Sequence, residues 1–474
     1  MSITFVVDEI HDLNTQIYSC DNIQYICTTP ACYSAQSEGG GWASMNKEVL
    51  ADYVNSGYIN LVTKETFIDQ INAYYLINLS SHNQFKSGII WKFFDEARLD
   101  FLKSTNMPIL LYYPLEGVGF FAIEDFLLNL KSKHNLGLSN KLVILTLSDI
   151  RTQDGNLIRL SDIHPELQGF QWVYSTAFFS RYTRPNNNNG LTQDTITYWH
   201  NHDNIIYKHD YQNKKYDFLC LNNTPSKNRQ LLLQELYRRP SLWNNNLISN
   251  RFDFLVKNNL HNSCETYKAR LVDLIKQEKN FYKDVNVIKS IDQNLNLFDN
   301  EFTADSNILK FLQEHMNSVY ENHYPLRDLN EEGRARNDNF MLDWYKDSCF
   351  TLITETHQWI QDLYMPTPMI TEKTIKSIIQ HHPFYIFGYS NNHKILHRLG
   401  FKTYEDILGL PRDDEMGNLT TIERLYNLVS ALERFDRNNL DFDKIEEYAA
   451  FNFDHLRNTD WLKLQCELLI NPTL

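Results

Sequence analysis

The chain has 474 residues and a formal net charge of −14, and 42% of its residues are hydrophobic. A chain of this length and apolar content is too long for one ordinary core, so we expect two domains. The acidic balance excludes a surface that attracts nucleic acid or anionic membrane as a whole, although it allows a local basic cleft. No run of about 18 apolar residues could span a bilayer, and no signal-peptide pattern is visible. We therefore expect a soluble, cytoplasmic protein. The seven cysteines form no CxxC pair, which argues against a disulfide framework or a zinc site.

In the first 200 residues, short apolar runs alternate with helical patterns. Strands are predicted over residues 3–9, 23–29, 73–79, 108–114, 141–147 and 171–179. Apolar residues at helical spacing predict helices over 89–104 and 122–133. This alternation is typical of a parallel sheet flanked by helices, so we expect a Rossmann-like α/β domain over residues 1–200.

A second alternating series follows the turn-like sequence TRPNNNNG at 183–190. It comprises predicted strands over 216–223, 246–249, 349–356 and 383–388 and predicted helices over 226–239, 371–382 and 392–400. Residues 251–340 read as an insertion, and residues 420–474 as helical. We therefore expect a second Rossmann-like domain over 201–474.

Two predicted helices of this second domain begin with cations. Thr371 is the expected N-cap of one helix, which places Lys373 in the first turn, where the helix dipole disfavours a positive charge. Lys227 and Arg229 occupy the same place in the helix after strand 216–223. Both helices follow strands of one parallel sheet, so their N-termini should meet at its carboxyl edge and form an anion site suited to a diphosphate. The alternative is that these cations simply point into solvent.

The ordered sequences LCLNNTPSKNR, TLITET, MITEKTIKSIIQHHPFYIFG and LGFKTYEDI resemble the donor-binding domain of GT-B glycosyltransferases. The similarity is to the α1,3-fucosyltransferase-like and exostosin-like groups, and to virus and phage proteins with the same order of motifs. It covers about residues 214–408 without the insertion, and TEK by itself is a weak motif. The resemblance implies two facing Rossmann-like domains and transfer of a hexosyl or deoxyhexosyl group.

The resemblance also implies roles for single residues. Arg229 and Lys373, with Lys227 and Thr371 beside them, would hold the diphosphate of a nucleotide sugar, and Glu372 would hold the ribose. Glu355 would lie close to the donor sugar as a catalytic residue. The remaining donor-site candidates are Asn222, Asn223 and His357.

The sequence TETHQW departs from the fucosyltransferase pattern and leaves the donor open. No predicted strand ends in Asp-x-Asp, so we expect no metal, and no cofactor beyond the nucleotide sugar itself. In GT-B enzymes the first domain binds the acceptor. A base that accepts the acceptor proton would come from a strand end there, with Glu116 ahead of Asp8, Glu9 and Asp149 because Gly117 leaves space for a substrate.

Three functions remain open. The first is glycosyl transfer to a glycan, protein or small molecule. The second is a non-enzymatic virion or assembly protein on the same scaffold, which internal ion pairs of Lys373 and Arg229 would favour. The third is transfer to modified DNA bases, which would need a basic stripe on the first domain, where the arginines form no dense run.

Overall fold

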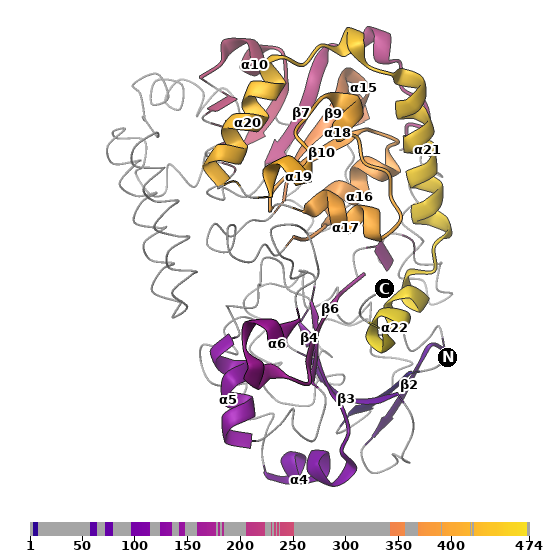
Figure 1. Cartoon of the computed structure of the whole chain (residues 1–474). Helices are drawn as coiled ribbons and strands as arrows, with labels where there is room; N and C mark the ends of the chain where they lie inside the picture. The colour runs from indigo at the N-terminus through magenta and orange to yellow at the C-terminus, as the bar shows by residue number, and fades with distance from the viewer. Residues whose placement is uncertain are drawn as a thin grey trace, which may run out of the picture. The chain divides into compact units, whose positions relative to one another are not determined.

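The computed structural model describes a subset of the chain. The described residues are 3–7, 57–63, 72–78, 96–113, 124–134, 142–146, 159–176, 179, 180, 183, 205–222, 229, 232, 233, 235, 236, 238–250, 342–355, 368–389, 391–417, 419 and 421–471. The chain divides into two compact units, each with its own parallel sheet (Figure 1). Unit 1 comprises residues 1–150, 156–198 and 458–474, and unit 2 comprises 151–155 and 199–457.

Unit 1 contains a six-stranded parallel sheet in the order β2-β1-β3-β4-β5-β6. Its strands are β1 (Ile3–Val7), β2 (Ile59–Thr63), β3 (Ala73–Asn78), β4 (Ile109–Tyr113), β5 (Leu142–Thr146) and β6 (Phe170–Tyr174). Its helices are α4 (Glu96–Thr105), α5 (Glu124–His134), α6 (Leu160–Ile163), the 3-10 turn η5 (Pro165–Leu167) and α22 (Trp461–Ile470). Every residue of β5 is buried, as expected for a parallel strand covered on both faces.

The last helix, α22, packs against the end of β6. The Trp461 ring stacks on Phe179 with 4.6 Å between the ring centroids. The Gln465 side chain accepts a hydrogen bond from the backbone N–H of Thr176 at 2.7 Å and donates one to the carbonyl of Tyr174 at 3.2 Å. Gln465 satisfies backbone groups at and beyond the end of β6, and residues 458–474 accordingly belong to unit 1. The sequence had placed these residues in the second domain, which was expected to cover 201–474.

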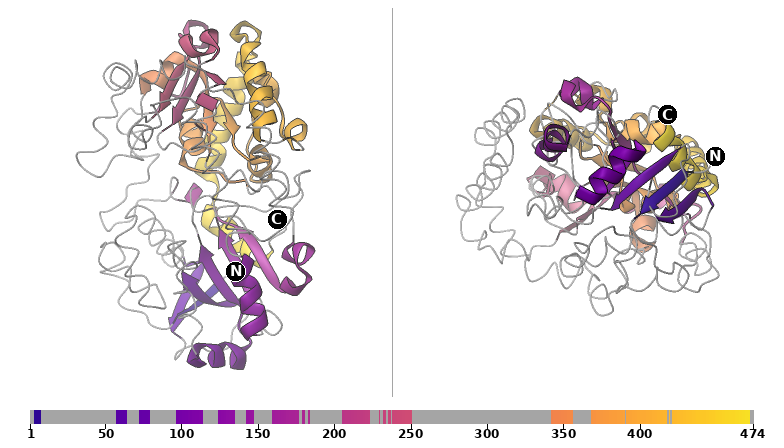
Figure 2. Two further views of the ribbon diagram at one scale, coloured as in Figure 1. Left: turned by 90° about the vertical axis from the view of Figure 1, so that its left-hand side faces the viewer. Right: turned by 90° about the horizontal axis from the view of Figure 1, so that it is seen from below.

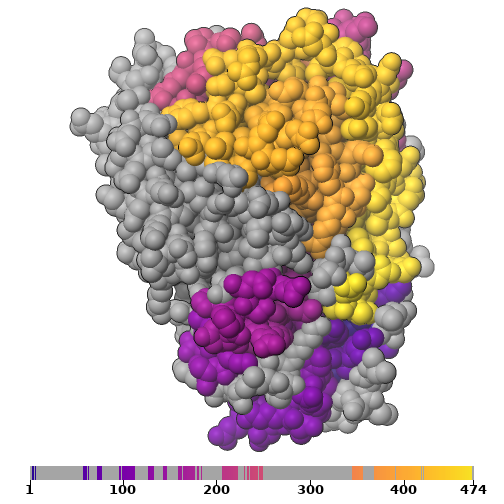
Figure 3. All heavy atoms as spheres, viewed as in Figure 1, coloured from indigo at the N-terminus to yellow at the C-terminus, as the bar shows by residue number. Residues whose placement is uncertain are grey.

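Unit 2 contains a four-stranded parallel sheet (Figures 1 and 2). Its strand order is β10-β9-β7-β8. Its strands are β7 (Tyr216–Asn222), β8 (Leu247–Asn250), β9 (Ser348–Thr354) and β10 (Phe384–Phe387). Its helices are α10 (Pro240–Asn244), α15 (Leu342–Asp347), α16 (Glu372–Ile379), α17 (Asn392–Arg398), α18 (Glu405–Leu408), α19 (Asp413–Met416), α20 (Thr421–Glu433) and α21 (Phe442–Asn458), with 3-10 turns η6 (Tyr211–Asn213) and η9 (Arg437–Asn439). Residues of α20 and α21 form much of the exposed face of this unit in Figure 3.

The predicted α/β class with parallel sheets is confirmed, while several boundaries differ. Strand β2 was not predicted, because INLVT mixes polar and apolar residues over only five positions. Helix α4 begins at Glu96, later than the expected residue 89. The predicted strand over 23–29 and the insertion 251–340 lie outside the described residues. None of the described helices is long and apolar enough to cross a membrane.

Candidate functional site

The carboxyl edge of the unit 2 sheet has the strand order that creates a ligand crevice in open α/β sheets. The chain passes from β7 to β8 on one side, while β9 pairs with β7 on the other side. In such sheets, ligands bind where the direction of winding reverses, which here is at the ends of β7 and β9. The hydroxyl of Thr354, the last residue of β9, donates a hydrogen bond to the side-chain oxygen of Asn222, the last residue of β7.

Arg229 reaches this same point. The residue is helical and 5% exposed, and its guanidinium Nη2 donates a hydrogen bond to the carbonyl oxygen of Thr354 at 2.9 Å. A carbonyl oxygen at the end of a strand has no further partner in the ladder, so Arg229 satisfies it while keeping its positive charge at the sheet edge. The guanidinium of Arg229 therefore lies at the end of β9, at the carboxyl edge of the sheet.

The helix over the TEK sequence begins as predicted. Thr371 is the N-cap of α16, and its hydroxyl oxygen accepts a hydrogen bond from the backbone N–H of Lys373 at 3.4 Å. Glu372 occupies the first turn, which suits the positive end of the helix dipole. The ammonium of Lys373 folds back and donates to the Thr371 hydroxyl at 3.1 Å.

The anion in front of this helix start is the protein's own Glu355. Its side chain is fully buried and follows directly after β9. Its carboxylate accepts hydrogen bonds from the backbone N–H of Thr371 at 3.0 Å, the hydroxyl of Thr371 at 2.6 Å and the hydroxyl of Thr374 at 3.1 Å. Glu355 therefore joins the end of β9 to the start of α16, and it supplies the negative charge that the helix dipole favours.

Lys373 forms ion pairs with two carboxylates. Its Nζ lies 3.5 Å from Glu355 and 3.3 Å from Glu372, and its side chain is 24% exposed. Burial raises the pKa of Glu372, but Lys373 and Lys376 outweigh burial and lower it to about 2. The position of Lys373 in the first turn is thus explained in part by its ion pair with Glu355. About a quarter of the Lys373 side chain remains exposed to solvent.

Two further buried residues, Arg424 and Asn392, lie at this edge and were not predicted from the sequence. Arg424 of α20 is 2% exposed and donates a hydrogen bond to the carbonyl of Gly388, directly after β10, at 2.9 Å. Asn392 accepts a hydrogen bond from the backbone N–H of Met369 at 3.0 Å. A Cβ at Gly388 would lie only 2.6 Å from the Asn392 amide nitrogen, so the close approach requires glycine there. Arg424 carries a faint sequence signal, since it occupies an otherwise apolar face of an amphipathic helix.

Several predicted site residues lie outside the described residues. These are Glu116, Lys227, Asn223 and His357, and also the alternative bases Asp8, Glu9 and Asp149. The described residues therefore bring together Asn222, Arg229, Glu355, Thr371, Glu372 and Lys373 at one sheet edge. Among the residues that the structure describes, no group of three or more His, Cys, Asp or Glu side chains could hold a metal ion.

The opposite, amino edge of the same sheet holds a buried network of neutral histidines. His209 donates from Nε2 to the carbonyl of Gln380 at 2.8 Å, and its Nδ1 accepts from the ammonium of Lys214 at 2.8 Å. His382 donates to the carbonyl of Ser348 at 2.9 Å. Burial, followed by the charge of Lys214, lowers the pKa of His209 to about 3, and burial lowers that of His382 well below its usual range.

The two edges of unit 2 therefore differ in chemistry. The amino edge carries neutral rings and one buried ammonium, that of Lys214, which satisfy backbone carbonyls and each other. The carboxyl edge carries two arginines, one lysine and two carboxylates, and it includes a helix N-terminus. Cations beside a helix N-terminus can bind an anionic group such as a diphosphate, provided that the ligand competes with the carboxylates already there. Comparison with protein-family models, with curated proteins and with solved structures found no match for this chain.

Proposed function

We propose that the chain is a nucleotide-sugar-dependent glycosyltransferase of GT-B type whose donor binds at the carboxyl edge of unit 2. The observation that carries this proposal is the convergence of Arg229 and Lys373 on consecutive residues, Thr354 and Glu355, at the end of one strand. This is the edge and the strand reversal at which open α/β sheets bind nucleotides.

The chemistry of transfer fits the residue types. The acceptor oxygen attacks the anomeric carbon, the bond from that carbon to the diphosphate breaks, and the diphosphate leaves with the electron pair. Negative charge grows on the departing oxygen, so a fixed cation and a helix N-terminus beside it lower the barrier. Lys373 is the described cation best placed for this role, because its ammonium lies at the first turn of α16 and its side chain is partly exposed.

Glu355 has a different part in this proposal from the one that the resemblance implied. A fully buried carboxylate with three hydrogen bonds and an ion pair orients Thr371 and Lys373, and it acts on the donor through them. Glu372, with 22% of its side chain exposed, remains the candidate for the ribose hydroxyls. The base in the first domain, with Glu116 as the leading candidate, stays a prediction.

A second candidate function is binding without catalysis. The observation that favours it is the ion pairing of Lys373 with Glu355 and Glu372, which leaves no described cation at this edge without an internal partner. A virion or assembly protein on this scaffold would need these charged side chains only to stabilise the fold, and internal ion pairs are sufficient for that.

The two candidates predict different products. The purified full chain is incubated with UDP-, GDP- and CDP-sugars, with and without a mixture of glycan acceptors, and release of the nucleoside diphosphate is followed. The transferase releases the diphosphate from one donor class, by slow hydrolysis in the absence of an acceptor and faster with one. Absence of release from every donor, in a protein whose fold is intact, would favour the binding protein.

A further inference from the structure

A pocket lies within unit 2, lined by residues of α17, α18 and α21 and of the segments that flank α18. Its volume is about 430 Å³, and its walls include His397, Lys402, Thr403, Asp406, Arg412 and Tyr448. A volume of this size falls in the range of small-ligand sites, about 300–1,000 Å³. None of these residues belongs to the carboxyl-edge site described above.

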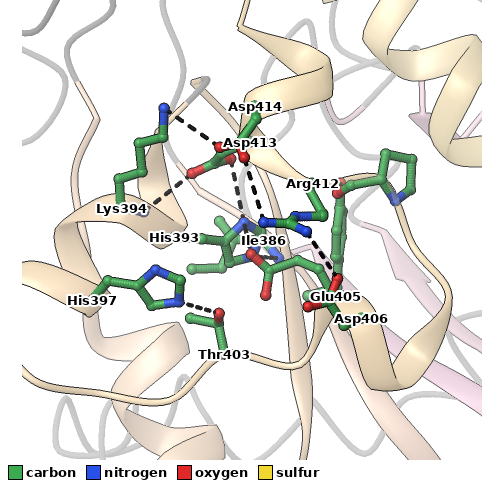
Figure 4. Close-up of polar contacts among 12 residues, drawn as sticks. Ile386, His393, Lys394, His397, Thr403, Glu405, Asp406, Arg412, Asp413 and Asp414 are labelled. Carbon is green, nitrogen blue, oxygen red and sulfur yellow. Dashed lines mark hydrogen bonds and ion pairs between the residues drawn. The ribbon is translucent and has the colours of Figure 1, made fainter. Parts of the chain in front are cut away.

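Two charged groups of the walls, Arg412 and Asp406, form an ion pair with each other. Arg412 lies 3.7 Å from the carboxylate of Asp406 and 3.4 Å from that of Asp414. Figure 4 shows Arg412 and Asp406 facing each other, with His397 and Thr403 in contact nearby. Both side chains are exposed, and the pair presents guanidinium donors and carboxylate acceptors side by side to a ligand in the pocket.

Glu405, which also lines the pocket, is turned toward the interior. Its carboxylate lies 3.3 Å from Nδ1 of His393, and Asp413 lies at the same distance from that nitrogen. Burial lowers the pKa of His393, but the two carboxylates outweigh burial and raise it to about 9. The backbone N–H of Ile386 donates a hydrogen bond to Nε2 at 3.1 Å, and this contact favours the neutral ring because it needs an Nε2 without a proton. In either state Nδ1 carries a proton that faces both carboxylates, and this contact holds the Glu405 side chain toward the interior.

The remaining wall is aromatic. The ammonium of Lys402 lies 5.9 Å from the centroid of Tyr448 and 5.4 Å from that of Phe451. The backbone of Lys402 is held on α21 by the Asn452 amide, which accepts from its N–H and donates to its carbonyl at 2.8 Å each. This double hydrogen bond ties α21, which carries Tyr448, to the segment that leads into α18.

We propose that this pocket binds a neutral carbohydrate ring. Two vicinal hydroxyls of a sugar match the pair of Asp406 and Arg412, since each hydroxyl both donates to a carboxylate and accepts from a guanidinium. The apolar C–H face of the ring would pack on Tyr448, and Thr403 offers a further hydroxyl. The proposal stands independently of the donor site and of any catalytic activity.

The test uses the full chain and nuclear magnetic resonance titration with glucose, galactose, mannose and N-acetylglucosamine. At least one sugar is expected to shift the backbone amide signals of Thr403 and Asp406 saturably, with an affinity in the millimolar range. Asp406→Asn and Tyr448→Leu should each weaken that binding about tenfold or more. Lys444→Met is the matched control, because Lys444 also lies over the Tyr448 ring, 5.6 Å from its centroid, but does not line the pocket.

Charged compounds complete the test. Phenyl phosphate and benzylamine, titrated in the same way, should shift these signals less than the best sugar does. If no sugar gives a saturable shift, if Asp406→Asn binds as tightly as the natural chain, or if either charged compound binds more tightly than every sugar, the pocket is not a carbohydrate site.

Discussion

The buried carboxylate of Glu355 accepts a hydrogen bond at 3.0 Å from the backbone N–H of Thr371, the N-cap of α16. This contact joins the end of a central strand to the start of the helix that carries the TEK sequence. It places one fixed negative charge at the positive end of the helix dipole, and Lys373 then balances that charge. The geometry of the candidate donor site therefore depends on Glu355.

Replacement of Glu355 by alanine is expected to destabilise unit 2 by about 3–5 kcal/mol. The loss leaves the N–H and hydroxyl of Thr371, the hydroxyl of Thr374 and the ammonium of Lys373 without their shared acceptor. Chemical denaturation measures the change. Glu372→Ala is the control, and it should cost less than about 1 kcal/mol because that side chain is partly exposed. Similar costs for the two variants would show that Glu355 does not hold the helix start.

Removal of the Trp461 ring tests the assignment of α22 to unit 1. Trp461 is 2% exposed, so Trp461→Ala should cost about 3–5 kcal/mol. The loss should appear as faster hydrogen exchange of the β6 amides, while β7 amides keep their protection. Phe451→Ala, at a ring that is 42% exposed, is the control and should change neither set. Faster exchange confined to β7 would place α22 with unit 2 instead.

Acid should destabilise unit 2 through its buried histidines. Burial lowers the pKa of His381 to about 4 and, with the charge of Lys214, that of His209 to about 3, and it lowers the pKa of His382 well below its usual range. Because the unfolded chain binds these protons below about pH 6.5 and the folded chain does not, stability falls as the pH drops below about 6.5 toward 4, with a slope that approaches ~1.4 kcal/mol per histidine and pH unit.

Hydrogen exchange of the β9 and β10 amides between pH 7 and 5, corrected for the intrinsic pH dependence of exchange, measures this loss. His382→Gln should reduce the slope, since glutamine can still donate to Ser348 and accept from Thr351 without taking up a proton. His397→Gln, at an exposed ring, should leave the slope unchanged. A slope that is the same in the natural chain and in His382→Gln would contradict this origin of the acid sensitivity.

Local patterns predicted the features of the fold that depend on local sequence. The run PFYIFG predicted a buried strand and TEK predicted a helix start, because a strand period and an N-cap are properties of a few neighbouring residues. Strand β2 was not predicted, since a short run of mixed residues becomes a strand through pairing with its neighbour in the sheet. The start of α4 at Glu96 was also not predicted.

In the candidate site, too, some features could be predicted from local sequence and others depend on contacts between distant residues. The convergence of Arg229 and Lys373 could be predicted, because parallel strands bring successive helix starts to one edge. The partners of these cations could not be predicted. Glu355 was expected beside a sugar, and only the fold shows that its carboxylate turns onto Thr371 and Lys373. Arg424 lies far along the chain in a helix whose sequence gives no reason to place it at Gly388.

The central claim concerns Lys373 and a diphosphate, and calorimetric titration tests it most directly. The natural chain, Lys373→Met and the control Lys376→Met are titrated with UDP, GDP, CDP and their sugar conjugates, after each variant is shown to be folded. We predict that one nucleotide class binds the natural chain and Lys376→Met alike, and that Lys373→Met binds it roughly 10- to 150-fold more weakly, as loss of a charge-assisted hydrogen bond requires. Absence of binding at millimolar concentration, or equal affinity in Lys373→Met, would contradict the claim and leave Lys373 as the counter-ion of Glu355.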